Sequence, residues 1–120
     1  MMREDSNPDS ILFEPDQRAL RWLQECVGLF FHYVEEVAGE SRVTEIDLSE
    51  TTITDEALTH VGQLTGLECL SLDDTNVSDV GLRQLFSLVR LKRLELRNTR
   101  ASDAGINSLQ QQLPACEMIR

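Results

Sequence analysis

The amino-acid sequence predicts an α/β fold in which similar units are stacked, with a parallel sheet on one face and short helices on the other. Three observations lead to this prediction. The sequence matches itself at a shift of 24 residues, which superposes Val43–Gly66, Leu67–Arg90 and Leu91–Pro114. The first half of each unit has the apolar alternation of a strand, and the second half has the apolar spacing of a helix. Units this short cannot bury their apolar faces alone, so we expect them to share one core.

The first residues of the chain show no apolar period, and we expect residues 1–13 to be a mobile acidic tail. Ile11, Leu12 and Phe13 form a short apolar group at its end. Two interpretations of this group stay open. It packs on the segment that follows, or it docks into a partner.

Residues 14–42 are expected to form an N-terminal cap that covers the first unit. Asp16 to Val27 places most of its apolar residues on roughly one helical face. Pro15 suits the first turn of this helix, and Gly28 suits the position just after its end. The buried face is expected to include Cys26.

The second part of the cap allows two interpretations. Leu29–Val34 is rich in apolar and aromatic residues, and we interpret it as a strand that pairs with Val43–Leu48. The alternative continues the helix to Ala38, because the helical spacing of apolar residues also continues. Gly28 interrupts that helix and therefore favours the strand.

Residues 43–120 are expected to hold three 24-residue repeats and a terminal half-repeat. In the middle unit the strand-like half contains Leu67, Leu70 and Leu72. The helix-like half of the same unit contains Leu82, Leu85 and Leu88. After a one-residue insertion among Gln110–Gln112, Cys116 takes the column of Leu67 and Leu91, and Ile119 takes the column of Leu70 and Leu94. The chain is thus expected to form a last strand over Cys116–Arg120.

Hydroxyl side chains stand before each helix-like half. Thr54, Ser78 and Ser102 occupy the place where an N-cap oxygen accepts a backbone N–H. An aspartate follows each of them and favours the positive end of the helix dipole.

The pattern L-x-x-L-x-L-x-x-T-x-V followed by S/T-D-x-G-L resembles a leucine-rich repeat. Two copies follow this pattern, Leu67–Val77 with Ser78–Leu82 and Leu91–Ala101 with Ser102–Ile106. Val43–Ile53 is a more divergent first copy, in which Ala57 replaces the glycine. The resemblance is to short bacterial members with the T-D-x-G-L signature, related to the cysteine-containing repeats found with F-boxes, although no F-box is present. It implies a right-handed solenoid. In this chain, threonine stands where many members of that family have asparagine. We expect the threonine hydroxyl to bond backbone groups at the bend after the strand.

Composition narrows the class of function. The 120 residues suffice for one domain, 41% of them are hydrophobic, and the formal net charge is -10. This charge disfavours nucleic acid and anionic membrane surfaces as partners, because both are bound mainly through Lys and Arg. No apolar run is long enough to span a membrane, and Met1–Ser10 does not have the pattern of a signal peptide. Three widely spaced cysteines favour free thiols and a cytoplasmic location.

We find no motif that predicts catalysis, a metal or a cofactor, and we expect an interaction protein rather than an enzyme. No paired Cys or His spacing of a zinc site is present. Asp73–Asp79 superficially resembles a calcium loop, but Asp79 stands where that loop needs glycine. A Cys–His pair is disfavoured, because His60 is on the helical half of its unit and Cys69 on the sheet half. Cys69 is expected on the exposed face of the sheet, where oxidation is conceivable.

The remaining surface is the exposed sheet face. Strand alternation places two or three residues of each unit outward. The candidate partner-binding residues are Glu45, Asp47, Ser71, Asp73, Arg93, Glu95, Arg97 and Met118. Residues 43–66 carry five acids and no base, whereas residues 91–120 carry three acids and five bases, so charge changes sign along the stack.

We predict that this face binds another protein, whose identity the sequence does not reveal, and that the protein is an adaptor. The alternative is a structural subunit that self-associates or joins a larger assembly through its cap or its terminal strand. Trp22 and Tyr33 are either anchors for a partner or parts of the core of the cap.

Overall fold

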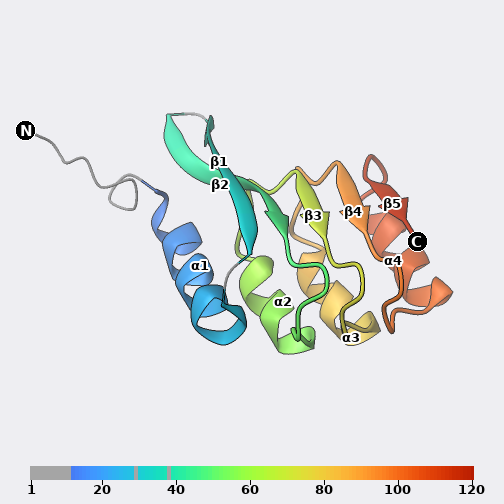
Figure 1. Cartoon of the computed structure of the whole chain (residues 1–120). Helices are drawn as coiled ribbons and strands as arrows, with labels where there is room; N and C mark the ends of the chain where they lie inside the picture. Colours follow the sequence, from blue (N-terminus) through green and yellow to red (C-terminus); the bar gives the residue numbers. More distant parts are fainter. Residues whose placement is uncertain (1–11, 29, 38) are drawn as a thin grey trace, which may run out of the picture.

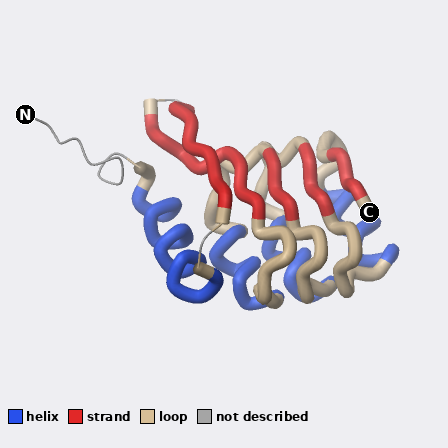
Figure 2. The backbone as a smooth tube through the Cα atoms, viewed as in Figure 1, coloured by secondary structure: helices blue, strands red, loops and turns tan. Residues whose placement is uncertain are grey.

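A five-stranded sheet and a layer of helices lie against each other in the computed structural model, which describes residues 12–28, 30–37 and 39–120 (Figures 1 and 2). The elements in chain order are α1 (Glu14–Val27), β1 (Phe31–Val37), β2 (Glu40–Asp47), α2 (Asp55–Val61), β3 (Cys69–Ser71), α3 (Asp79–Leu82), the 3₁₀ helix η2 (Arg83–Leu85), β4 (Arg93–Glu95), α4 (Asp103–Gln112) and β5 (Glu117–Ile119). The strands follow the order β1-β2-β3-β4-β5, so each new strand joins the edge beside the previous one.

The strands from β2 to β5 are parallel, and β1 runs antiparallel to β2. The strand interpretation of the cap is confirmed, with bounds Phe31–Val37 in place of Leu29–Val34; Leu29 and Ala38 lie outside the described residues. The helical alternative is wrong, because α1 ends at Val27. Gly28 then has a φ of 91°, in the left-handed region that residues with side chains rarely adopt.

The core lies between the sheet and the helices and consists of the repeated apolar columns. Leu48, Leu72 and Leu96 are buried after successive strands, and the corresponding helix positions are equally buried. Corresponding positions of the 24-residue alignment are thus buried alike in the core. The helical halves, however, differ in length: α4 has ten residues, whereas α3 has four before η2 begins.

The N-terminal end of this core is closed by α1 and the residues just before it. Ala19 and Leu23 of α1 are fully buried. Leu12 is also buried and forms a bridge to Ser41, and the Arg42 guanidinium lies 4.0 Å above the ring of Phe13. Leu12 and Phe13 thus pack on the cap, while Ile11 and the preceding residues lie outside the described residues.

Two expectations about α1 need correction. Cys26 is exposed rather than buried, because the buried face of the helix runs from Asp16 to Leu23 and does not continue into the last turn. Asp16 is fully buried, although the sequence suggested only a helix start. Its Oδ2 accepts a hydrogen bond from the Val43 N–H at 2.8 Å and lies 3.4 Å from Nε of Arg42.

The bend after each strand is built in the same way in every unit. The hydroxyls of Thr51, Thr75 and Thr99 donate to the carbonyls of Leu48, Leu72 and Leu96 at 2.7, 2.7 and 3.1 Å. The expectation for the threonine column is confirmed. Just before each threonine, the backbone is left-handed, with φ between 56° and 58° at Glu50, Asp74 and Asn98.

The aspartates at the helix starts join consecutive units. Asp55 accepts from the backbone N–H and the hydroxyl of Ser78 at 2.6 and 2.5 Å. Asp79 accepts from the same two groups of Ser102 at 2.7 and 2.5 Å. The N-cap expectation is wrong for Ser78, whose hydroxyl donates to Asp55 and makes no cap hydrogen bond. Thr54 also makes no side-chain cap, and Ser102 alone of the three caps its helix, by accepting from Gly105 N–H.

Candidate functional site

The sheet turns one face to the helices and the other outward (Figure 2). Strand pairing arranges the outward side chains in two rows. The first row contains Tyr33, Glu45, Cys69, Arg93 and Glu117. The second row contains Phe31, Asp47, Ser71, Glu95 and Ile119. Residues directly opposite each other on paired strands project from the same face, so the rows form one continuous surface. We call it the outer sheet face.

A shallow groove of about 150 Å³ crosses the outer sheet face over β3. Its cause is side-chain size. Cys69 and Ser71 are short, and longer side chains of β2 and β4 stand on both sides of them. Five of the predicted site residues line this groove: Glu45, Asp47, Ser71, Arg93 and Glu95. The structure therefore brings the central part of the predicted surface together.

The cations of this surface are already paired. Arg93 donates through Nε and Nη2 to the same carboxylate oxygen of Glu95, at 3.2 and 2.9 Å. The hydrogen bond from Arg93 is the main cause that lowers the pKa of Glu95. Arg97 donates to Asp73 through its side chain at 2.9 Å and through its backbone N–H at 2.7 Å. The expected basic patch is thus largely neutralised by neighbouring acids.

The end of the outer sheet face differs from the expectation. Met118, not Ile119, pairs with Leu94, and Met118 packs against the core. Compared with the earlier units, this unit has one residue more before Leu113 and one residue fewer between Cys116 and β5. The strand β5 therefore returns to the 24-residue register. The prediction that Met118 belongs to the outer sheet face is therefore wrong, and Ile119 occupies that position instead. Arg120 turns to the helical side, where it donates to Asp103 and Asn107.

Two aromatic side chains extend the outer sheet face at its other end. Phe31 is 78% exposed and Tyr33 is 62% exposed, and they lie beside Asp47 and Glu45. Tyr33 was an alternative anchor in the sequence, while Phe31 was missed because its register with Asp47 depends on the antiparallel pairing. Trp22 does not lie on this surface. It is half-buried against the core and stacks on His60 with ring centroids 3.9 Å apart.

The thiol in the groove is not activated. Burial, followed by the nearby Glu45 and Glu68 carboxylates, raises the pKa of Cys69, so the thiol stays protonated at neutral pH. Burial also raises the pKa of Cys116, to about 11. Within the part of the chain that the structure describes, no group of three or more His, Cys, Asp or Glu could hold a metal ion.

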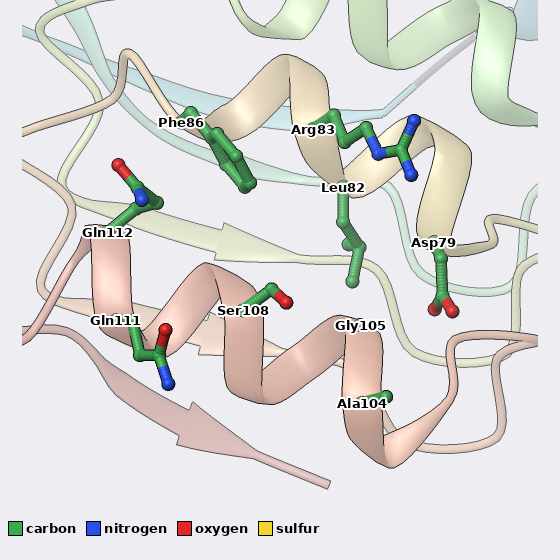
Figure 3. Close-up of a pocket in the computed structure, with 9 residues that line it drawn as sticks. All are labelled: Asp79, Leu82, Arg83, Phe86, Ala104, Gly105, Ser108, Gln111 and Gln112. Carbon is green, nitrogen blue, oxygen red and sulfur yellow. The ribbon is translucent and has the colours of Figure 1, made fainter.

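A second hollow lies on the opposite side of the molecule, between α3–η2 and α4 (Figure 3). Its volume is about 460 Å³, and the small residues Ala104, Gly105 and Ser108 leave the space open. Asp79, which borders it, is held by Ser102, and that hydrogen bond lowers the pKa of Asp79. The hollow therefore offers no uncommitted carboxylate to a ligand.

The five-stranded sheet and its layer of helices define an α/β protein with a leucine-rich-repeat-like fold. The structure is similar to the leucine-rich-repeat ectodomain of the receptor kinase SOBIR1 from Arabidopsis thaliana, with a TM-score of 0.60 and 20% sequence identity. The similarity covers 89% of this chain and 65% of the ectodomain, so the chain spans less than two thirds of that neighbour. No protein-family model and no curated protein sequence matches the chain. Among residues 12–28, 30–37 and 39–120, no helix is long and apolar enough to cross a membrane.

Proposed function

We propose that this protein is a non-enzymatic interaction module that binds another protein through its outer sheet face. The observation that carries this proposal is the groove over β3, in which five of the predicted binding residues meet. The short side chains of Cys69 and Ser71 leave room for side chains of a partner, and the surrounding charged groups would fix its orientation. The leucine-rich-repeat-like fold supports protein partners in general.

We also propose the finer assignment to a right-handed solenoid of three repeats, residues 43–120, with a cap over residues 14–42. The repeated contact between Asp55 and Ser78, and between Asp79 and Ser102, supports it, because each unit binds the next in the same way. The S/T-D-x-G-L signature supports the short bacterial subclass. The three free cysteines support a cytoplasmic location.

The test uses one substitution that fills the groove and one matched substitution on the other side. Ser71→Tyr places a large ring over β3, whereas Ser108→Tyr places the same ring in the hollow between α3–η2 and α4. Both residues have side chains that reach solvent, so we expect both variants to fold. Partners are captured from the native cells with each tagged form. A protein retained by the original chain and by Ser108→Tyr but lost by Ser71→Tyr supports the proposal, and equal retention by both variants contradicts it.

Self-association is the second candidate function, and the two edge strands β1 and β5 favour it. Molecular mass measured by light scattering at two concentrations separates the candidates. A mass that rises with concentration supports a structural subunit, whereas a constant monomer mass supports the interaction module.

A further inference from the structure

Phe31, Tyr33, Glu45 and Asp47 form a compact block on the outer sheet face, which we call the aromatic–acidic corner. In the antiparallel pairing of β1 with β2, Phe31 lies opposite Asp47 and Tyr33 lies opposite Glu45. Opposite residues have their Cβ atoms about 5 Å apart. Each ring therefore has a carboxylate beside it.

The rings of Phe31 and Tyr33 are exposed, although β1 is paired with a strand that buries apolar side chains in the core. The partner strand β2 turns Val43 and Ile46 into the core, where both are fully buried. Phe31 and Tyr33 point the other way, and within the described residues no element covers them. Two large apolar side chains left exposed on an edge strand are unusual in a monomer and indicate a contact surface.

The charge around the rings is negative. No Lys or Arg occurs from Val43 to Leu82 or within β1. Arg42, the nearest cation on β2, is directed to Asp16 and Thr65. Arg93, two strands away, is bound to Glu95. Among the described residues, the side chain of Glu45 makes no hydrogen bond or ion pair.

We propose that the aromatic–acidic corner binds an extended basic segment of the partner protein, with lysine or arginine side chains lying over the rings and beside the two carboxylates. The inference rests on the proposed function and names the chemistry of the partner. A cation gains from the negative face of an aromatic ring and from a carboxylate at the same time. Phe31 and Tyr33 are two residues apart on one strand, so they are roughly 7 Å apart, which matches alternate side chains of an extended segment.

The test measures binding of a short fluorescent peptide that alternates lysine with serine, and the matched peptide with glutamate in place of lysine. Binding is followed by fluorescence anisotropy. We expect the lysine peptide to bind and the glutamate peptide not to bind. Phe31→Thr/Tyr33→Thr keeps the strand preference of these positions but removes the rings, and we expect it to weaken the lysine peptide about tenfold. Val80→Thr/Val89→Thr, which alters exposed apolar residues of α3 and of the loop before β4, is its control.

A second pair of variants separates the corner from the general acidity of the protein. Glu45→Gln/Asp47→Asn removes two charges at the corner, and Asn keeps an oxygen that accepts from Ser49. Glu25→Gln/Glu56→Gln removes two exposed charges from α1 and α2. We expect about a tenfold loss of peptide affinity in the first variant and less than about twofold in the second. Unchanged melting temperatures verify that all four variants are folded.

Several results would overturn the inference. Equal losses in both charge variants would show that only net charge attracts the peptide, and unchanged affinity without the rings would show that they take no part. If the protein forms a dimer at higher concentration and the dimer does not bind the peptide, the corner would be assigned to a second copy of the chain. A native partner lost by Ser71→Tyr but kept by both corner variants would refute the basic-segment inference and leave the proposed function standing.

Discussion

The carboxylate of Asp55 occupies the space that a side chain at Gly81 would need. A β-carbon at residue 81 would overlap Oδ1 of Asp55, and it would also be 2.8 Å from Cδ1 of Leu58. Asp55 is fixed there because it accepts two hydrogen bonds from Ser78. The glycine of one unit therefore makes room for the aspartate of the unit before it. The first unit has no such unit before it and carries Ala57 instead.

Gly81→Ala should destabilise the protein by up to about 2 kcal/mol. The overlap costs about 1–3 kcal/mol, as for other overpacked sites, and the better helix propensity of alanine returns only part of it. Leu58 is fully buried, so a shift of its side chain would disturb the close packing around it. Urea unfolding measures the change, and the double variant Asp55→Ala/Gly81→Ala should show a smaller added loss than the sum of the two single changes. A stabilisation of about 1 kcal/mol by Gly81→Ala would contradict the tight contact between units.

Leu70→Ala and Leu94→Ala should each cost about 2–5 kcal/mol, as buried leucines do elsewhere. Both side chains are buried on the inner side of neighbouring strands, and Leu70 pairs with Leu94. Val89→Ala is a suitable control, because Val89 is 77% exposed. Chemical unfolding gives the free energies, and a loss well below 1 kcal/mol at both leucines would mean that this register of the sheet is wrong.

The stability of the protein should depend on the ionisation of Asp16. Burial raises the pKa of Asp16, and this outweighs the hydrogen bond from Val43 and the charge of Arg42, which lower it. Because the folded-state pKa is above the unfolded one, the favourable contribution is complete below the unfolded pKa and is lost as pH rises through the folded pKa. Relative to Asp16→Asn, the original chain should therefore lose stability as pH rises above the ordinary aspartate pKa of about 3.9.

This pH dependence is measured as the difference in unfolding free energy between the two proteins at each pH. The difference cancels the opposing contributions of Glu95 and Asp79, whose pKa values are lowered. A difference that grows in favour of the original chain as pH rises would show that the ion pair with Arg42 outweighs burial.

Arg93→Glu/Arg97→Glu should lower the melting temperature measurably as well as disturb the outer sheet face. The new glutamates would stand beside Glu95 and Asp73, which now bind the two arginines. Arg93→Gln/Arg97→Gln removes the same ion pairs without the repulsion and should melt at an intermediate temperature. If calorimetry shows the same melting temperature for all three proteins, these ion pairs contribute nothing to the folded state.

The repeated leucines made the fold predictable from sequence, because a column such as Leu48, Leu72 and Leu96 must be buried in every unit alike. The groove was predictable in part, since strand alternation placed Glu45 and Ser71 outward. What the sequence could not provide was the register at the two ends. The position of Met118 depended on how the insertion near α4 was offset, and the exposure of Phe31 depended on the antiparallel pairing of β1.

In the sequence, the contacts between units are evident only as residue types that recur every 24 residues. The recurrence of Asp55 and Asp79 suggested helix starts, but their hydrogen bonds to Ser78 and Ser102 arise only when units are stacked. The burial of Asp16 likewise has no local signal, because it results from the packing of α1 against the start of β2.

The measurement that tests the central claim most directly is site-specific photo-crosslinking in native cells, with the crosslinking amino acid at residue 71 or at residue 108. Residue 71 lies in the groove over β3, and residue 108 borders the hollow between α3–η2 and α4. We predict a crosslink to another protein from residue 71 and none to that protein from residue 108. A crosslink to that protein from residue 108 alone would contradict the assignment of partner binding to the outer sheet face.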